Sequence, residues 1–196
     1  MSVWEKITVR QYLEMLDIEQ NKNIDDFEKQ VKLLCVIDNK KETDYDNVKY
    51  KDFLERLKVV TDEIRKIPTP KAQNYISVNG NRYKFVHELN ELTAGQFIDF
   101  NHFAKDIMNY NKTCSVFFLG MKGERVCAYG EIPQDKIAED FLDAKFIEVH
   151  GCMLFFYHLL IESTLRMLYS SEKMVETMKR EMDNSMQIGV GNIHLN

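Results

Sequence analysis

The stretch LTAGQFIDF, residues 92–100, encodes a helix start and repeats a pattern already present in ITVRQYLEM, residues 7–15. In each stretch a threonine stands three residues before a glutamine: Thr8 with Gln11, and Thr93 with Gln96. This is the spacing of a capping box, in which the two side chains satisfy backbone N–H groups of the first turn. We therefore expect a helix to begin at each site, and loss of a cap residue to cost about 1 kcal/mol.

The two stretches share more than the cap. Each is followed by an apolar segment, VKLLCVI from Val31 and CSVFFLGM from Cys114, and then by an Asp-Phe-Leu triplet, at Asp52 and at Asp140. Two helices that converged on a common cap would explain the threonine and glutamine alone. The repeated order instead favours a degenerate internal duplication whose halves meet near IPTPKAQ, residues 67–73.

Apolar periodicity predicts several helices. Asn23 can cap a helix with one apolar face made of Ile24, Phe27, Val31, Leu34 and Cys35. A second helix before Pro68 directs six residues toward the core: Phe53, Leu54, Leu57, Val60, Ile64 and Ile67. After the second box a helix is expected over residues 94–109, with Phe97, Ile98, Phe103 and Ile107 inward. Further helices are expected over residues 135–144 and 146–169, and a last one from Ser171.

Between the two halves the period changes to that of strands. NYISVNGNRYKFV, residues 74–86, has two β-prone runs around Asn79-Gly80, which indicates a type I′ hairpin. The run at Cys114 fits either a strand or a buried helix. The sequence thus predicts a mainly α (α+β) fold with a central β-hairpin. The expected parts are an N-terminal helical subdomain (1–70), the hairpin with a second helical subdomain (71–170), and a C-terminal helix and tail (171–196).

Composition restricts the function classes. The 196 residues are 44% hydrophobic and 29% charged, with a net charge of −5, which opposes general binding to nucleic acid or anionic lipid. The longest apolar run, residues 149–161, is shorter than the roughly 20 residues of a membrane span. The four cysteines are widely spaced, and we expect them to be reduced and buried.

Motifs of catalysis are missing from the sequence. HELNE, residues 87–91, lacks the second histidine of the zinc-protease pattern, and no phosphate loop or nucleophile elbow is present. We expect no enzyme activity, no catalytic or metal-binding residues and no cofactor.

Four methionines spaced four apart mark the last predicted helix: Met174, Met178, Met182 and Met186. Methionine repacks readily against varied apolar partners, so this stripe is the candidate partner-binding surface. The alternative is that the stripe docks the helix onto the core of its own chain.

Four segments, in this order, carry a family resemblance: ITVRQYLEML, YISVNGNRYKFV, ELTAGQFIDF and KIAEDFLDAKFIEVHGCMLFFYHLL. Together they make the chain resemble the tail-assembly-chaperone-like proteins of bacteriophages of Bacteroidales, including crAss-like phages, over most of residues 4–165. One departure is the segment Phe118–Gly123, which replaces the turn that commonly follows the apolar helix after the second box.

The resemblance implies a small, non-enzymatic, largely helical protein that binds phage structural proteins, among them tail, tape-measure, portal or capsid components. It would act in the host cytoplasm during assembly, as a monomer or a homo-oligomer. The alternative is a structural or packaged virion component, such as a ring, a connector or a cargo protein.

Overall fold

The computed structural model describes residues 2–190, with the side chains of residues 2–166, 168–169, 173–174 and 176–177. The chain divides into two compact units, Met1–Phe155 and Phe156–Asn196. The described residues form seven α-helices and one four-stranded antiparallel sheet. The predicted mainly α (α+β) class is therefore confirmed.

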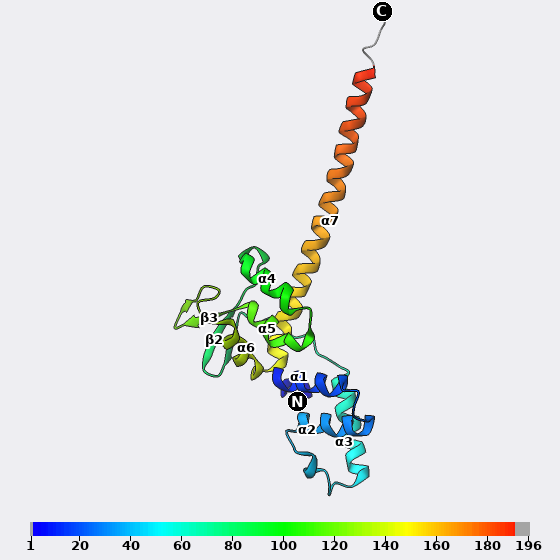
Figure 1. Ribbon diagram of the computed structural model, residues 1–196, viewed down its shortest axis with the longest axis vertical. Coiled ribbons are helices and arrows are strands. Elements are labelled where there is room, and N and C mark those ends of the chain that lie inside the picture. The colour runs from blue at the N-terminus through cyan, green and yellow to red at the C-terminus, as the bar shows by residue number, and fades with distance from the viewer. Residues whose placement is uncertain (1, 191–196) are drawn as a thin grey trace, which may run out of the picture. The chain divides into compact units, whose positions relative to one another are not determined.

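The first half of the first unit is helical (Figure 1). Its elements are η1 (Val3–Glu5), α1 (Val9–Gln20), α2 (Asp26–Asp38), η2 (Glu42–Asp44) and α3 (Tyr50–Ile64). Leu34, Phe53 and Val60 are buried together between α2 and α3. The prediction for Phe27, Leu54 and Ile67 was wrong: their side chains are 52%, 41% and 50% exposed, and α3 ends at Ile64, before the residue expected to close its apolar face.

Both capping boxes are present. Thr8 caps α1, and Thr93 caps α4 (Ala94–Phe103). In each box the backbone N–H of the threonine donates to the glutamine Oε1, over 2.9 Å to Gln11 and 3.1 Å to Gln96. The hydroxyl of the threonine accepts the glutamine's backbone N–H over 3.2 Å in both. The local sequence is therefore sufficient to begin these two helices.

The same glutamines also join helices. Gln11 Nε2 donates to the carbonyl oxygen of Val36 in α2 over 2.8 Å, and Gln96 Nε2 donates to that of Val116 over 2.7 Å. Val36 lies in the last turn of α2 and Val116 is the last residue of α5, where carbonyls lack a partner within their own helix; the Val36 carbonyl also accepts the N–H of the cap residue Asn39 over 3.4 Å. The two halves thus share a tertiary contact as well as a spacing, while the duplication itself stays a prediction.

The sheet has strand order β1-β2-β3-β4, with all neighbours antiparallel. Its strands are β1 (Tyr75–Val78), β2 (Asn81–Phe85), β3 (Phe118–Lys122) and β4 (Arg125–Val126). Asn79 and Gly80 both have positive φ, 51° and 74°, as a type I′ turn requires. The predicted hairpin is confirmed, and β3 extends it, because an isolated two-stranded hairpin is barely stable.

The second half of the chain supplies the remaining helices. They are η3 (Leu89–Glu91), α4, η4 (Ile107–Asn109), α5 (Tyr110–Val116), α6 (Gln134–Leu142) and α7 (Phe146–Val190). The ambiguous apolar run divides at Phe117, so that its first part is helix and its second part is strand. The helix expected over residues 94–109 ends at Phe103, and the inward placement of Phe97, Ile98 and Ile107 was wrong, since these side chains are 50%, 65% and 46% exposed.

The helix expected to begin at Ser171 is not separate. The backbone remains helical from Phe146 to Val190, through both serines at 170–171. Serine in a helix interior costs only a few tenths of a kcal/mol relative to alanine, and no proline interrupts the segment.

The sheet packs on α6, beside which Figure 1 shows β2 and β3. The Phe141 ring lies 5.2 Å from that of Tyr83 and 4.7 Å from that of Phe118, measured between centroids. The Asp140 carboxylate accepts hydrogen bonds from the Tyr83 hydroxyl and from Asn81 Nδ2. Aromatic contacts and one acidic side chain therefore fix the hairpin to the helix.

Candidate functional site

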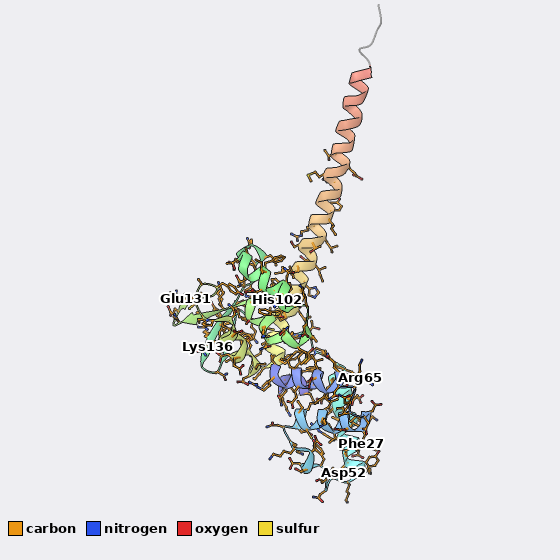
Figure 2. The ribbon with its side chains drawn as sticks, in the orientation of Figure 1. Phe27, Asp52, Arg65, His102, Glu131 and Lys136 are labelled. Carbon is orange, nitrogen blue, oxygen red and sulfur yellow. The ribbon has the colours of Figure 1, made fainter. Side chains whose placement is uncertain are left out.

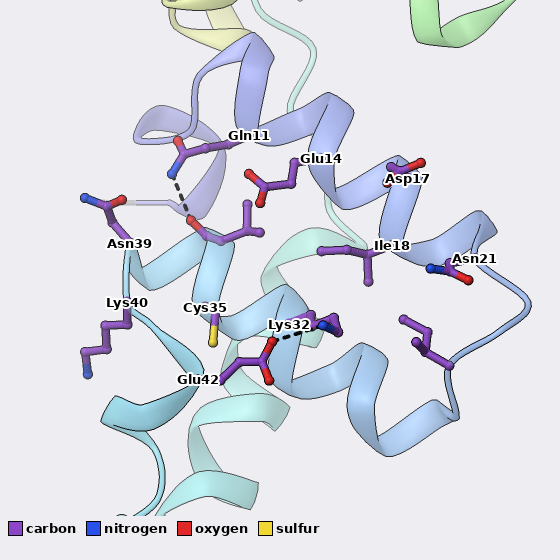
Figure 3. Close-up of a pocket in the computed structure, with 12 residues that line it drawn as sticks. Gln11, Glu14, Asp17, Ile18, Asn21, Lys32, Cys35, Asn39, Lys40 and Glu42 are labelled. Carbon is purple, nitrogen blue, oxygen red and sulfur yellow. Dashed lines mark hydrogen bonds and ion pairs between the residues drawn. The ribbon is translucent and has the colours of Figure 1, made fainter.

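A polar cleft lies between α1 and α2, with a volume of about 430 Å³ (Figure 3). The α1 side carries Glu14 and Asp17, and the opposite side carries Lys32, Cys35 and Glu42. The hydrogen bond from Gln11 to α2 also borders it. This cleft is the place where titratable side chains gather around a cavity, so it is the first candidate for chemistry.

Lys32 forms ion pairs with two carboxylates on its own side of the cleft, one in α2 and one in η2. Its Nζ lies 3.0 Å from Glu42 Oε1 and 3.4 Å from Glu28 Oε1. The hydrogen bond to Glu42, with the attraction of both carboxylates, raises the pKa of Lys32. A lysine held in the charged form is not a nucleophile or a general base near neutral pH.

Cys35 is likewise not activated. Burial raises the pKa of its thiol, and the nearby carboxylates of Glu42 and Asp44 raise it further. Reactive cysteines need a lowered pKa, because the thiolate is the nucleophile. The described side chains of the polar cleft therefore offer no activated nucleophile, and the cleft supports ordinary polar contacts better than catalysis.

A second cavity, the aromatic groove, opens between α2, the segment after η2 and the start of α3, with a volume of about 260 Å³. Its apolar lining consists of Phe27, Val31, Tyr45, Val48, Tyr50 and Phe53. Phe27 is 52% exposed and Tyr50 66% exposed; Figure 2 labels Phe27 on the outer side of the N-terminal helices. The groove thus exposes large rings to solvent.

Ring contacts and hydrogen bonds hold the buried side of the aromatic groove in place. The buried Phe53 ring lies 5.6 Å from the Phe27 ring and 6.0 Å from the Tyr45 ring. The Tyr45 hydroxyl donates to Asp38 Oδ2 over 2.9 Å, and Arg56 also donates to the Asp38 carboxylate. Burial alone would raise the pKa of Asp38, but the hydrogen bonds from Arg56 and Tyr45 outweigh burial and lower it. Asp38 is therefore a carboxylate at neutral pH and can hold Tyr45.

The second unit presents an apolar face along its part of α7. Ile161 is 57% exposed, Leu165 59% and Tyr169 71%. Residues four apart advance about 40° around a helix, so the three side chains occupy one face about 80° wide. We call this the α7 face. An exposed aliphatic and aromatic face of this kind is typical of a surface that binds protein.

The methionine stripe is only partly described. Met174 is exposed, and Met178, Met182 and Met186 belong to α7 but their side chains lie outside the described residues. Met174 follows Ile161 by thirteen residues, which turns it about 220° around the axis. The structure therefore does not place Met174 on the α7 face, and the role of the stripe stays a prediction.

Sequence reasoning assigned the cap residues to structure and missed the aromatic groove. Tyr45 and Tyr50 belong to ETDYDNVKY, residues 42–50, a largely polar segment that nevertheless carries two tyrosines and a valine without helical period. These large residues in a polar segment were the available signal. Phe27 was assigned to the core because it shares the period of its helix, although it comes in the first turn, where the neighbouring helix covers it only in part.

Two further observations concern the described residues alone. They contain no group of three or more His, Cys, Asp or Glu side chains arranged to hold a metal ion. Within the same residues, no helix combines the length and the apolar character that crossing a bilayer demands.

No protein-family model matches the chain, and no curated protein or solved structure is significantly similar to it. No function is therefore transferred from a relative, and the resemblance to phage tail-assembly chaperones stays a prediction.

Proposed function

We propose that this protein is a non-enzymatic phage morphogenesis factor that binds other phage proteins in the manner of a tail-assembly chaperone. The α7 face supports binding, since three large apolar side chains there are more than half exposed. The order of the four resembling segments supports the class of partner, which is a tail, tape-measure, portal or capsid protein.

The α7 face supplies the physical means. Complete burial of an Ile, Leu or aromatic side chain is worth about 1.5–3 kcal/mol. Covering the exposed half of Ile161, Leu165 and Tyr169 would therefore contribute about 1 kcal/mol each. Such a surface can cover an apolar helix of a client and lower the concentration of its aggregation-prone form until assembly displaces it.

The α7 face can be tested with a double variant, Ile161→Ala with Leu165→Ala. Its control is Glu162→Ala with Arg166→Ala, which has the same spacing on the same helix but lies about 100° around it and removes only an exposed ion pair. Tagged proteins would be recovered from infected host cells, and bound phage proteins quantified by mass spectrometry. We expect the first variant to lose tail or tape-measure proteins at least fivefold and the control to retain them. Equal recovery by both variants would overturn the role of the α7 face.

The methionine stripe is tested by removing residues 172–196. These residues belong to the second unit, so we expect the first unit to keep its thermal unfolding transition while client recovery falls. Global unfolding of the truncated chain would instead support docking of the stripe on its own core.

Mass spectrometry of purified particles distinguishes the proposed chaperone from a virion component. A chaperone is absent from finished particles, whereas a ring, connector or cargo protein recurs at a fixed number of copies. Recovery of host metabolic enzymes alone, with no phage structural protein, would contradict both assignments.

A further inference from the structure

We propose that the aromatic groove is a second docking site, on the first unit, for a protein segment in which lysine or arginine flanks an aromatic or large aliphatic side chain. Binding at the aromatic groove does not depend on the phage assignment. The groove indicates the charge of its partner, which the apolar side chains of the α7 face do not.

The size of the groove favours a protein side chain over a free small molecule. Its volume, about 260 Å³, is below the roughly 300 Å³ at which pockets for small ligands begin. The groove also opens to solvent past the exposed rings of Phe27 and Tyr50. An open groove of this size accommodates one or two side chains of a segment whose backbone stays outside.

The exposed rings are not needed by the core. Phe53 already fills the space between α2 and α3 with Leu34 and Val60. Tyr50 is the first residue of α3 and is two-thirds exposed, so its ring contributes little buried area to folding. The groove can therefore gain burial from a partner without any rearrangement of the unit.

The charge at the groove selects the flanking residues of that partner. Glu42 and Asp46 line it, and none of its described lining residues is a lysine or an arginine. The Glu42 carboxylate already forms an ion pair with Lys32. The Asp46 carboxylate has no ion pair or hydrogen bond among the described residues. A cation beside the apolar side chain would pair with Asp46, while an acidic flank would be repelled.

The aromatic rings of the groove also favour a partner that carries a cation. The faces of Tyr and Phe rings attract cations within about 6 Å of the centroid. Lys40 Nζ of the chain itself lies 5.3 Å from the centroid of Tyr45, so a cation of a partner is left to the exposed rings of Phe27 and Tyr50. Tyr45 is also held by its hydrogen bond to Asp38, so little freedom is lost when a partner binds.

Two tripeptides of opposite charge test the proposal on the full-length protein. The probes are acetyl-Lys-Trp-Lys-amide and acetyl-Glu-Trp-Glu-amide, titrated into ¹⁵N-labelled protein and followed by two-dimensional NMR at low salt. We expect the basic peptide to bind at least fivefold more tightly and to shift the amide signals of Phe27, Asp46 and Tyr50. We also expect the difference between the peptides to shrink in 0.5 M NaCl, because salt screens exposed charges.

Variants connect the binding to the groove. Tyr50→Ala should weaken the basic peptide at least fivefold, and Asp46→Asn should weaken it about two- to fivefold, as the loss of an exposed ion pair does. The control is Glu124→Gln, an exposed acidic residue in the β3–β4 turn. Peptide binding that is absent, equal for both charges, mapped elsewhere or indifferent to Tyr50→Ala would overturn the proposal. None of these outcomes depends on the recovery of phage proteins, so the proposed function succeeds or fails separately.

Discussion

Replacing Gln96 by glutamate separates the two roles of this side chain. As a cap alone, glutamate is as good as glutamine, because its carboxylate accepts the Thr93 N–H and lies near the positive end of α4. As a bridge between helices, glutamate fails, because a carboxylate cannot donate to the carbonyl oxygen of Val116. A capping box alone thus predicts no loss of stability, whereas the observed structure predicts a clear one.

The expected loss is about 2–4 kcal/mol. Gln96 is 1% exposed, and Val116 is fully buried, so the orphaned carbonyl costs about 1–3 kcal/mol. Burial of the new carboxylate would raise its pKa, and each unit of that rise costs about 1.4 kcal/mol at neutral pH. Gln11→Glu provides the matched comparison. Gln11 borders the polar cleft, where water can reach the acceptor, and there we expect a loss of about 1–2 kcal/mol.

Urea denaturation at pH 7 measures both losses, and each kcal/mol should lower the thermal midpoint by about 2–4 °C. The raised pKa in the folded Gln96→Glu protein means that protonation favours folding, so its deficit should narrow as the pH falls toward about 4.3. A Gln96→Glu protein within about 0.5 kcal/mol of the parent at pH 7 would refute the bridging role, as would a deficit larger for Gln11→Glu than for Gln96→Glu.

Two further predictions concern α7 and its surroundings. Gly151→Ala should destabilise the first unit by about 1–3 kcal/mol, because the added Cβ would lie 2.9 Å from the carbonyl oxygen of Lys71, and backbone cannot yield as a flexible side chain does. Gly95→Ala in α4 is its control, since the nearest atom there is 3.7 Å away, and we expect no loss or a small gain; equal effects of the two substitutions in thermal unfolding would contradict the close approach. Burial lowers the pKa of His150, so the unfolded chain binds the proton more readily and stability should fall as the pH drops below about 6.5. His150→Phe, which can keep the ring stacked on Phe146, should show a smaller loss between pH 7 and pH 5.5 in urea denaturation, and an unchanged loss would show that His150 does not carry this dependence.

The two candidate binding surfaces differ in how far the sequence predicts them. Ile161, Leu165 and Tyr169 lie within the helix that the sequence predicts over residues 146–169, so their common face follows from helical spacing, whereas their exposure does not. The aromatic groove requires Phe27 and Tyr50, from two different helices, to be brought together over Phe53. No periodicity within either helix reports that juxtaposition, because it depends on how α2 meets α3.

The sequence by itself determined the features whose cause lies within a few residues. Thr8 with Gln11 and Thr93 with Gln96 start helices, and Asn79-Gly80 turns a hairpin, because these residues act on backbone groups next to them.

Only the tertiary structure decided what those same residues do at a distance. It directed the free amide of each glutamine to the end of the following helix, divided the apolar run at Phe117 into helix and strand, and placed Gly151 against the backbone of Pro70 and Lys71. The physical reason is that an apolar or polar side chain encodes a preference for burial or for a hydrogen bond, while the identity of its partner depends on which segment the whole chain brings to it.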